Sequence, residues 1–127
     1  MSEFRIGNAI ISLTDLIDDP HPIEVLTQQI GFTLAGNPIN SAFETIIWRW
    51  TNMSQPGWNQ IMEFWKTNVE IANPPAHVYI TSRKETGEIF EFGNYKCRMG
   101  KPVSTVDAVV SQIRNGQVTF YQCELLS

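Results

Sequence analysis

The chain has 127 residues, a length that favours a single domain spanning 1–127. Only 17% of the residues are charged, against roughly 25% in ordinary proteins, and this low fraction favours extensive protein–protein contact. The net charge of −4 combines nine Lys and Arg with thirteen Asp and Glu and includes no basic run, so the composition argues against specific binding to nucleic acid. No apolar run approaches the roughly 18 residues that span a bilayer. The N-terminus MSEFRIGNAI has neither the charged n-region nor the apolar h-region of a signal peptide. We therefore expect a protein that is made in the cytoplasm and is not held in a membrane.

The first part of the chain predicts two strands separated by a loop. Residues 4–13 are rich in isoleucine and alternate, which predicts a strand. Residues 14–22 contain acids and two prolines that interrupt any regular element. A second strand is predicted from Glu24 to Ile30, followed by a turn at Ala35 to Pro38.

The middle of the chain predicts a half-buried strand followed by a helix. The strand runs from about Ser41 to Thr51, and its alternation places Trp48 and Trp50 on one face. Ser54 is a suitable N-cap for a helix over about 55–68. Within that helix, helical spacing gives an apolar stripe of Trp58, Ile61, Met62 and Trp65.

A β-hairpin is predicted after the prolines at 74 and 75. The segments HVYITSR and IFEFGNYKC alternate, and they flank KETGE, in which Gly87 takes the positive-φ position.

A second hairpin is predicted at the end, where 104–114 and 117–126 flank Asn115-Gly116, the strongest short hairpin signal. The spacing of the apolar residues in 104–114 also fits a helix, but the turn and the β-branched content favour a strand. The order of elements predicts a mainly β (α+β) fold, an antiparallel sandwich or barrel with one flanking α-helix.

All four tryptophans lie between Glu44 and Asn68, which raises three interpretations: a sugar-binding platform, a surface for stacking bases, or a core. Each aromatic side chain buries about 150–250 Å². The phase of the strand and of the helix turns the rings toward the same interior. We therefore expect the tryptophans to form core.

The sequence contains no recognisable catalytic constellation, because HExxH, GxSxG and P-loop motifs are all missing. His21 and His77 lie in proline-rich junctions, and the nearby acids do not have the glycine-centred spacing of a calcium loop. Cys97 and Cys123 fit small buried residues better than a disulfide or a metal site. We expect no enzyme, no metal and no cofactor.

Three segments occur in an order that resembles small tail structural proteins of long-tailed bacteriophages, a tail tube-like family. They are FETIIWRWTNMSQPGWNQIMEFW, HVYITSRKETGEIFEFGNYKCRMGKP and NGQVTFYQCELL. In that family a W-x-W-like strand leads into x-x-W-x-x-I/L, then a hairpin with a turn glycine. A Met-x-x-Pro-like element follows, here Met99 to Pro102. The resemblance covers about Ser41 to Ser127.

The resemblance implies a tail-tube-like β-sandwich whose copies form rings, hexameric in the family, that stack into a virion tail tube. DNA passes through such a tube without specific binding, and the other partners are further tail proteins. The chain is short for a tube subunit, which leaves room for an adaptor or distal-tail role. The family's long loops dock into the next ring, and the matching residues here are Leu16, Ile17, Asp18, Asp19, Arg83, Lys84, Glu85, Thr86, Gly87 and Glu88.

Two other classes of function remain open from the sequence. One is a small non-enzymatic binding module, such as a capsid decoration protein or a carbohydrate-binding sandwich. Exposed Trp48 and Trp50 and a monomeric state in solution would favour it. The other is an enzyme or toxin-related domain, which would need a pocket where Asp, Glu and His converge.

Overall fold

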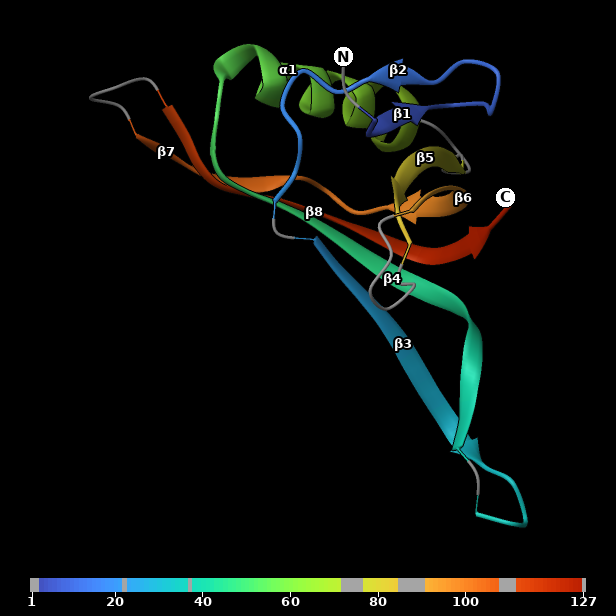
Figure 1. Cartoon of the computed structure of the whole chain (residues 1–127). Helices are drawn as coiled ribbons and strands as arrows, with labels where there is room; N and C mark the ends of the chain where they lie inside the picture. Colours follow the sequence, from blue (N-terminus) through green and yellow to red (C-terminus); the bar gives the residue numbers. More distant parts are fainter. Residues whose placement is uncertain are drawn as a thin grey trace.

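A computed structural model of the chain describes residues 3–21, 23–36, 38–71, 77–84, 91–107 and 112–126. These residues form one antiparallel sheet of eight strands and one helix that continues into a π-helical segment (Figure 1). In chain order the elements are β1 (Arg5–Gly7), β2 (Thr14–Asp15), β3 (Ile23–Phe32), β4 (Pro38–Met53), α1 (Gln55–Trp65), η1 (Lys66–Glu70), β5 (Val78–Arg83), β6 (Phe92–Met99), β7 (Val103–Asp107) and β8 (Gln112–Leu125).

The sheet is open, and its strands follow the order β2-β1-β5-β6-β8-β4-β3. β8 is the central strand. It pairs with β4 along one side, and on the other side it pairs with β7 in its first part and β6 in its last part. The predicted class, antiparallel β with one helix, is confirmed.

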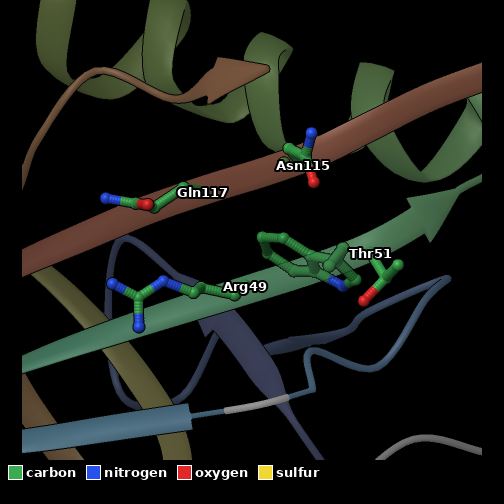
Figure 2. A pocket seen from close by; sticks show the side chains of 6 residues that line it. Arg49, Thr51, Asn115 and Gln117 are labelled. Carbon is green, nitrogen blue, oxygen red and sulfur yellow. The ribbon is translucent and has the colours of Figure 1, made fainter. Parts of the chain in front are cut away.

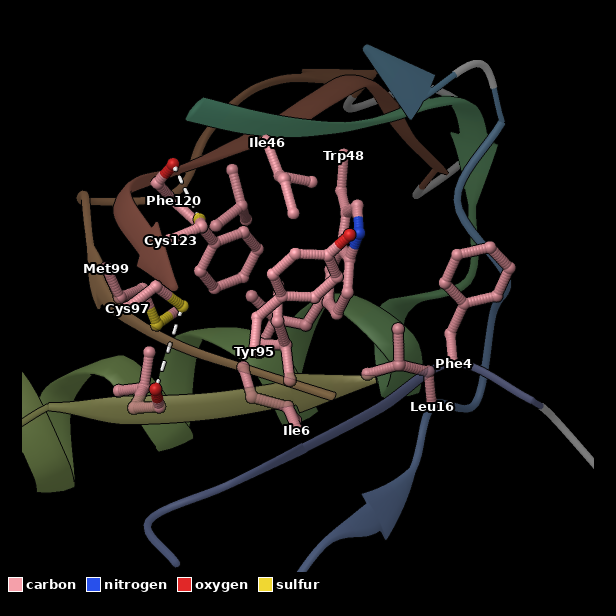
Figure 3. Close-up of a cluster of buried hydrophobic side chains, with 14 of the residues drawn as sticks. Phe4, Ile6, Leu16, Ile46, Trp48, Tyr95, Cys97, Met99, Phe120 and Cys123 are labelled. Atoms are coloured by element: carbon pink, nitrogen blue, oxygen red, sulfur yellow. Dashed lines mark hydrogen bonds between the residues drawn. The ribbon is translucent and has the colours of Figure 1, made fainter. Parts of the chain in front are cut away.

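The sheet curls around the core. This curl brings the start of β1 close to β4, although three strands separate β1 from β4 in the sheet order. The rings of Phe4 and Trp48 meet edge to face with centroids 5.9 Å apart. Figure 3 shows side chains from β4, β6 and β8 meeting in this interior, and the largest fully buried ones are Trp48, Tyr95, Phe120, Ile6, Ile46, Ile61, Ile80, Val78 and Val118.

The tryptophans belong to this core, as the alternation of the strand predicts. Trp48 is 0% exposed and Trp50 is 3% exposed, while the half-buried Trp58 and Trp65 of α1 pack against the same cluster. Trp48 makes two further T-shaped ring contacts in this cluster. Its ring centroid lies 4.7 Å from that of Phe120 and 6.3 Å from that of Trp50. A platform built on Trp48 and Trp50 is therefore not available at the surface.

The helix begins where its capping residue predicts. The Ser54 hydroxyl accepts a hydrogen bond of 3.2 Å from the Gly57 amide, and a proline occupies the first helical turn. The predicted helix over 55–68 is confirmed, with the difference that its last part, Lys66–Glu70, is π-helical.

The predicted strand over 4–13 is much shorter in the structure, ending at Gly7. The chain then turns, with the Ser12 amide bonded to the Ala9 carbonyl at 3.0 Å, and β2 returns beside β1. A side chain at position 7 would place its Cβ 2.4 Å from the Ser12 carbonyl oxygen. Gly7 thus lets the returning chain pass close to the end of β1, and the turn that follows outweighs the β preference of the isoleucines.

The predicted turn at Asn115-Gly116 is wrong, because both residues lie inside β8. Asn115 has φ of 52°, and the register between β7 and β8 shifts beside it, so the pair forms a β-bulge. A bulge with a residue at positive φ and a tight hairpin turn favour the same residue types, Asn and Gly, so the two cannot be told apart from the dipeptide alone. The connection between β7 and β8 lies instead at 108–111, outside the described residues.

The first predicted hairpin is confirmed as the antiparallel pair β5 and β6, closed by a 2.8 Å hydrogen bond from the Lys84 amide to the Glu91 carbonyl. Its tip at 85–90, including Gly87, lies outside the described residues.

Candidate functional site

A long arm made of β3 and the first part of β4 projects from the body of the protein (Figure 1). β8 pairs with β4 only from Glu44 onward, so the earlier part of β4 pairs with β3 alone. The arm ends in a turn at Thr33–Gly36, with Gly36 at φ of 85°. Leu34 lies at this tip and is fully exposed. The sequence predicts the turn but not the projection, because projection depends on where β8 stops pairing.

β3 is also the last strand of the sheet on its side. It is ten residues long and, within the described residues, pairs only with β4. An unpaired strand edge presents a row of backbone donors and acceptors to other chains. β3 therefore offers an edge at which another strand can pair, although its register with β4 is irregular between Thr27 and Gly31.

Large apolar side chains also lie on the outer face of the sheet, away from the core. Leu26 and Tyr121 each follow a residue that packs in the core, so the alternation of a strand turns them outward. Leu26, Phe43, Val103 and Tyr121 are each 46–54% exposed. An outer face with this composition fits contact with protein.

A polar hollow of about 250 Å³ interrupts the same face. Figure 2 shows Arg49 and Thr51 of β4 beside Asn115 and Gln117 of β8, and Arg49 lies directly opposite Gln117 in the register. Arg49 forms an ion pair with Glu24 of β3. Both partners are partly exposed, so the pair contributes at most about 1 kcal/mol. The hollow provides hydrogen-bonding groups but no nucleophile activated by a base.

The predicted interface loop at 14–22 is divided between the interior and the surface. Leu16 is buried in the chain's own core, so it does not extend toward a neighbour, while Ile17 is 57% exposed. Asp18 fastens the loop to α1, since its Oδ2 accepts hydrogen bonds of 2.9 Å from the Ser54 amide and 2.7 Å from the Ser54 hydroxyl. Of the residues predicted in this loop, Ile17 and Asp19 are the ones exposed at the surface.

The other predicted interface segment is the hairpin tip. Arg83 is the last residue of β5 and Lys84 follows it, and both are half-buried. Glu85, Thr86, Gly87 and Glu88 lie outside the described residues. The structure brings Arg83 close to the end of the 14–22 loop, because Arg83, Pro20 and His21 line one hollow of about 370 Å³. The two predicted segments therefore meet on one side of the molecule.

Two titratable groups among the described residues, His77 and Cys97, have clearly shifted pKa values. Partial desolvation and the charges of Arg98 and Lys96 lower the pKa of His77 below 6.5, although this side chain is exposed. Hydrogen bonding with Cys123 and burial raise the pKa of the Cys97 thiol, and both cysteines are free. Among the described residues no group of three His, Cys, Asp or Glu side chains is placed to hold a metal ion.

Within the same residues, no helix is long and apolar enough to cross a membrane. Comparison of the chain with protein-family models, with curated proteins and with solved structures finds no match.

Proposed function

We propose that the chain is a structural subunit of a bacteriophage tail, a tail tube, adaptor or distal-tail protein that works by assembling with copies of itself. In this role the curled sheet serves as a sandwich-like body, the subunits form rings, and DNA passes through the channel in the virion. The subunit needs no catalytic group, metal or cofactor. The observation that carries the proposal is the β3–β4 arm with Leu34 at its tip.

The tip of the arm leaves a gain in free energy unused while the protein stays alone in solution. Burying a leucine side chain is worth roughly 1.5–3 kcal/mol relative to leaving it in water, and Leu34 gains none of this within its own chain. A neighbouring subunit that covers the tip supplies that free energy. The projection of the arm also lets the tip reach beyond the subunit's own body (Figure 1).

The open edge of β3 supports lateral assembly. Pairing with a strand of the next copy satisfies backbone groups on the open edge of this ten-residue strand and extends the sheet across the contact. The net charge of −4 supports the passage of DNA, because a negatively charged protein does not retain a phosphate backbone.

The alternative of a small binding module loses its main support, since Trp48 and Trp50 are buried. A capsid decoration protein uses surface contacts as well, but it does not need an arm that ends in a fully exposed leucine.

The experiment that tests the proposal is mass in solution against concentration, by sedimentation and by negative-stain microscopy of the most concentrated sample. We expect rings or tubes with a central channel, and a much higher concentration needed to assemble Leu34→Ser. The matched control is Ile71→Ser, an exposed isoleucine at the end of η1, which should assemble like the unchanged chain. A wild-type chain that stays monomeric at every soluble concentration would falsify self-assembly.

A further inference from the structure

A small hollow lies between the β1–β2 connection and the helix, away from the arm. Its volume is about 260 Å³, and its polar lining is entirely neutral, contributed by Asn8, Ser12, Thr14, Gln60 and Asn68. Phe64, which is half-buried, supplies apolar surface to the same hollow. Ligand pockets for drug-sized molecules usually measure about 300–1,000 Å³. This hollow, at about 260 Å³, is slightly smaller, so it has room for a ligand with a single ring.

The helix presents three of these residues in one row. Gln60, Phe64 and Asn68 are spaced by four residues, which places them on the same face of a helix. Asn68 belongs to the π-helical segment η1, and its Nδ2 donates a hydrogen bond of 3.0 Å back to the Phe64 carbonyl. Single π-helical turns occur frequently at functional sites.

The amide groups of the hollow are held in fixed orientations. Gln60 accepts a hydrogen bond of 2.9 Å from the Ile17 amide and donates one of 2.8 Å to the Asp15 carbonyl. Asn8 donates to Oδ1 of Asn68 at 3.4 Å. Each side-chain amide nitrogen carries two hydrogens, so each of these three amides has one N–H beyond the hydrogen bonds described here.

This lining selects the chemistry of the ligand. A charged ligand finds no opposite charge in the hollow, and a purely apolar one leaves the amides and hydroxyls without partners. Ligand hydroxyl groups both donate and accept hydrogen bonds, as the Ser12 and Thr14 hydroxyls do. The carbon-bound hydrogens of a sugar ring pack against the half-buried Phe64. We propose that this hollow binds one neutral sugar residue, and the inference does not depend on self-assembly.

The sugar has two possible sources, the end of a glycan chain or a free hexose. The choice of the molecule used in the binding test distinguishes between them. Methyl glycosides of glucose, galactose, mannose and N-acetylglucosamine imitate a glycan end, and the free sugars test the second source. Binding of the methyl glycosides assigns a glycan, whereas binding of free sugars alone assigns a soluble sugar.

The test is a titration of the ¹⁵N-labelled chain with each probe, followed through its side-chain amide signals. We expect saturable shifts of the Asn8, Gln60 and Asn68 signals for at least one probe. Asn8→Ala and Ser12→Ala change exposed residues and should each weaken binding about fivefold, the effect of losing one neutral hydrogen bond.

The matched control is Asn59→Ala, an exposed asparagine of α1 outside the hollow, which should bind like the unchanged chain. The proposal is overturned if no probe gives saturable shifts at its highest soluble concentration. It is equally overturned if Asn8→Ala and Ser12→Ala bind as tightly as Asn59→Ala, or if an acidic sugar binds more tightly than its neutral form.

Discussion

The hydrogen bond between Trp48 and Ser82 provides the sharpest test of how the core is built. The indole Nε1 donates to the Ser82 hydroxyl at 2.9 Å, and both side chains are 0% exposed. Ser82→Ala leaves the indole N–H buried without an acceptor. Trp48→Phe leaves the hydroxyl without this donor and opens a space beside Phe120, whose ring centroid lies 4.7 Å from that of Trp48.

The expected losses of stability follow from these contacts. An unsatisfied buried polar group costs about 1–3 kcal/mol, so Ser82→Ala should destabilise the fold by about 2 kcal/mol. Trp48→Phe adds the loss of packed volume and should destabilise by about 3–4 kcal/mol. In the double variant no polar group remains unpaired. Its loss should therefore be smaller than the sum of the single losses by about 1–2 kcal/mol.

The assay is urea unfolding followed by circular dichroism, because removing a tryptophan changes the fluorescence signal. An unchanged slope against urea shows that the same surface is exposed in each variant. Ser12→Ala, at an exposed serine, should stay within about 0.5 kcal/mol of the unchanged chain and serves as the control. Single losses that add to the double loss within about 0.5 kcal/mol would refute the coupling between the two side chains.

Three further predictions concern single positions. Gln122 has φ of 51° and is exposed, so Gln122→Gly should raise the unfolding free energy by about 0.5–1 kcal/mol in the same assay; a loss of stability would contradict this. The thiols of Cys97 and Cys123 are buried and the pKa of Cys97 is raised, so a thiol reagent at pH 8 should label them only after unfolding, and rapid labelling of the native chain would be the opposing result. The lowered pKa of His77 means that its contribution to stability is fully present above pH 6.5 and is lost as the pH falls through the folded-state pKa. A titration by NMR should therefore give a midpoint below 6.5 that rises in Arg98→Gln; a midpoint above 6.5 would contradict it.

The parts of the fold that the sequence predicts are those specified by local signals. Ser54 caps the helix in the structure as the sequence indicates, and the alternation around Trp48 places that side chain in the core. Both signals involve residues close together in the chain, so propensity and periodicity are sufficient to identify them.

The parts that the sequence does not predict depend on distant residues. Asn115-Gly116 has the local signature of a turn, but β4 pairs continuously past it, with Trp50 opposite Gly116, and this converts the turn into a bulge. Leu16 looks like an exposed apolar residue of an acidic loop until the curled sheet encloses it. The hollow between the β1–β2 connection and the helix joins Asn8 to Asn68, and no periodic pattern connects two positions so far apart.

The central position of β8 has a consequence for how the chain folds. The hairpins β3–β4 and β5–β6 form from neighbouring segments, but they become one sheet only when β8 inserts between β4 and β6. That step must first close the long loop between β4 and β8, so it should be slow. Until β8 arrives, the edges of β4 and β6 that it covers are open to strands from other chains. The speed of this insertion therefore sets what fraction of newly made chains reaches the native sheet rather than aggregating.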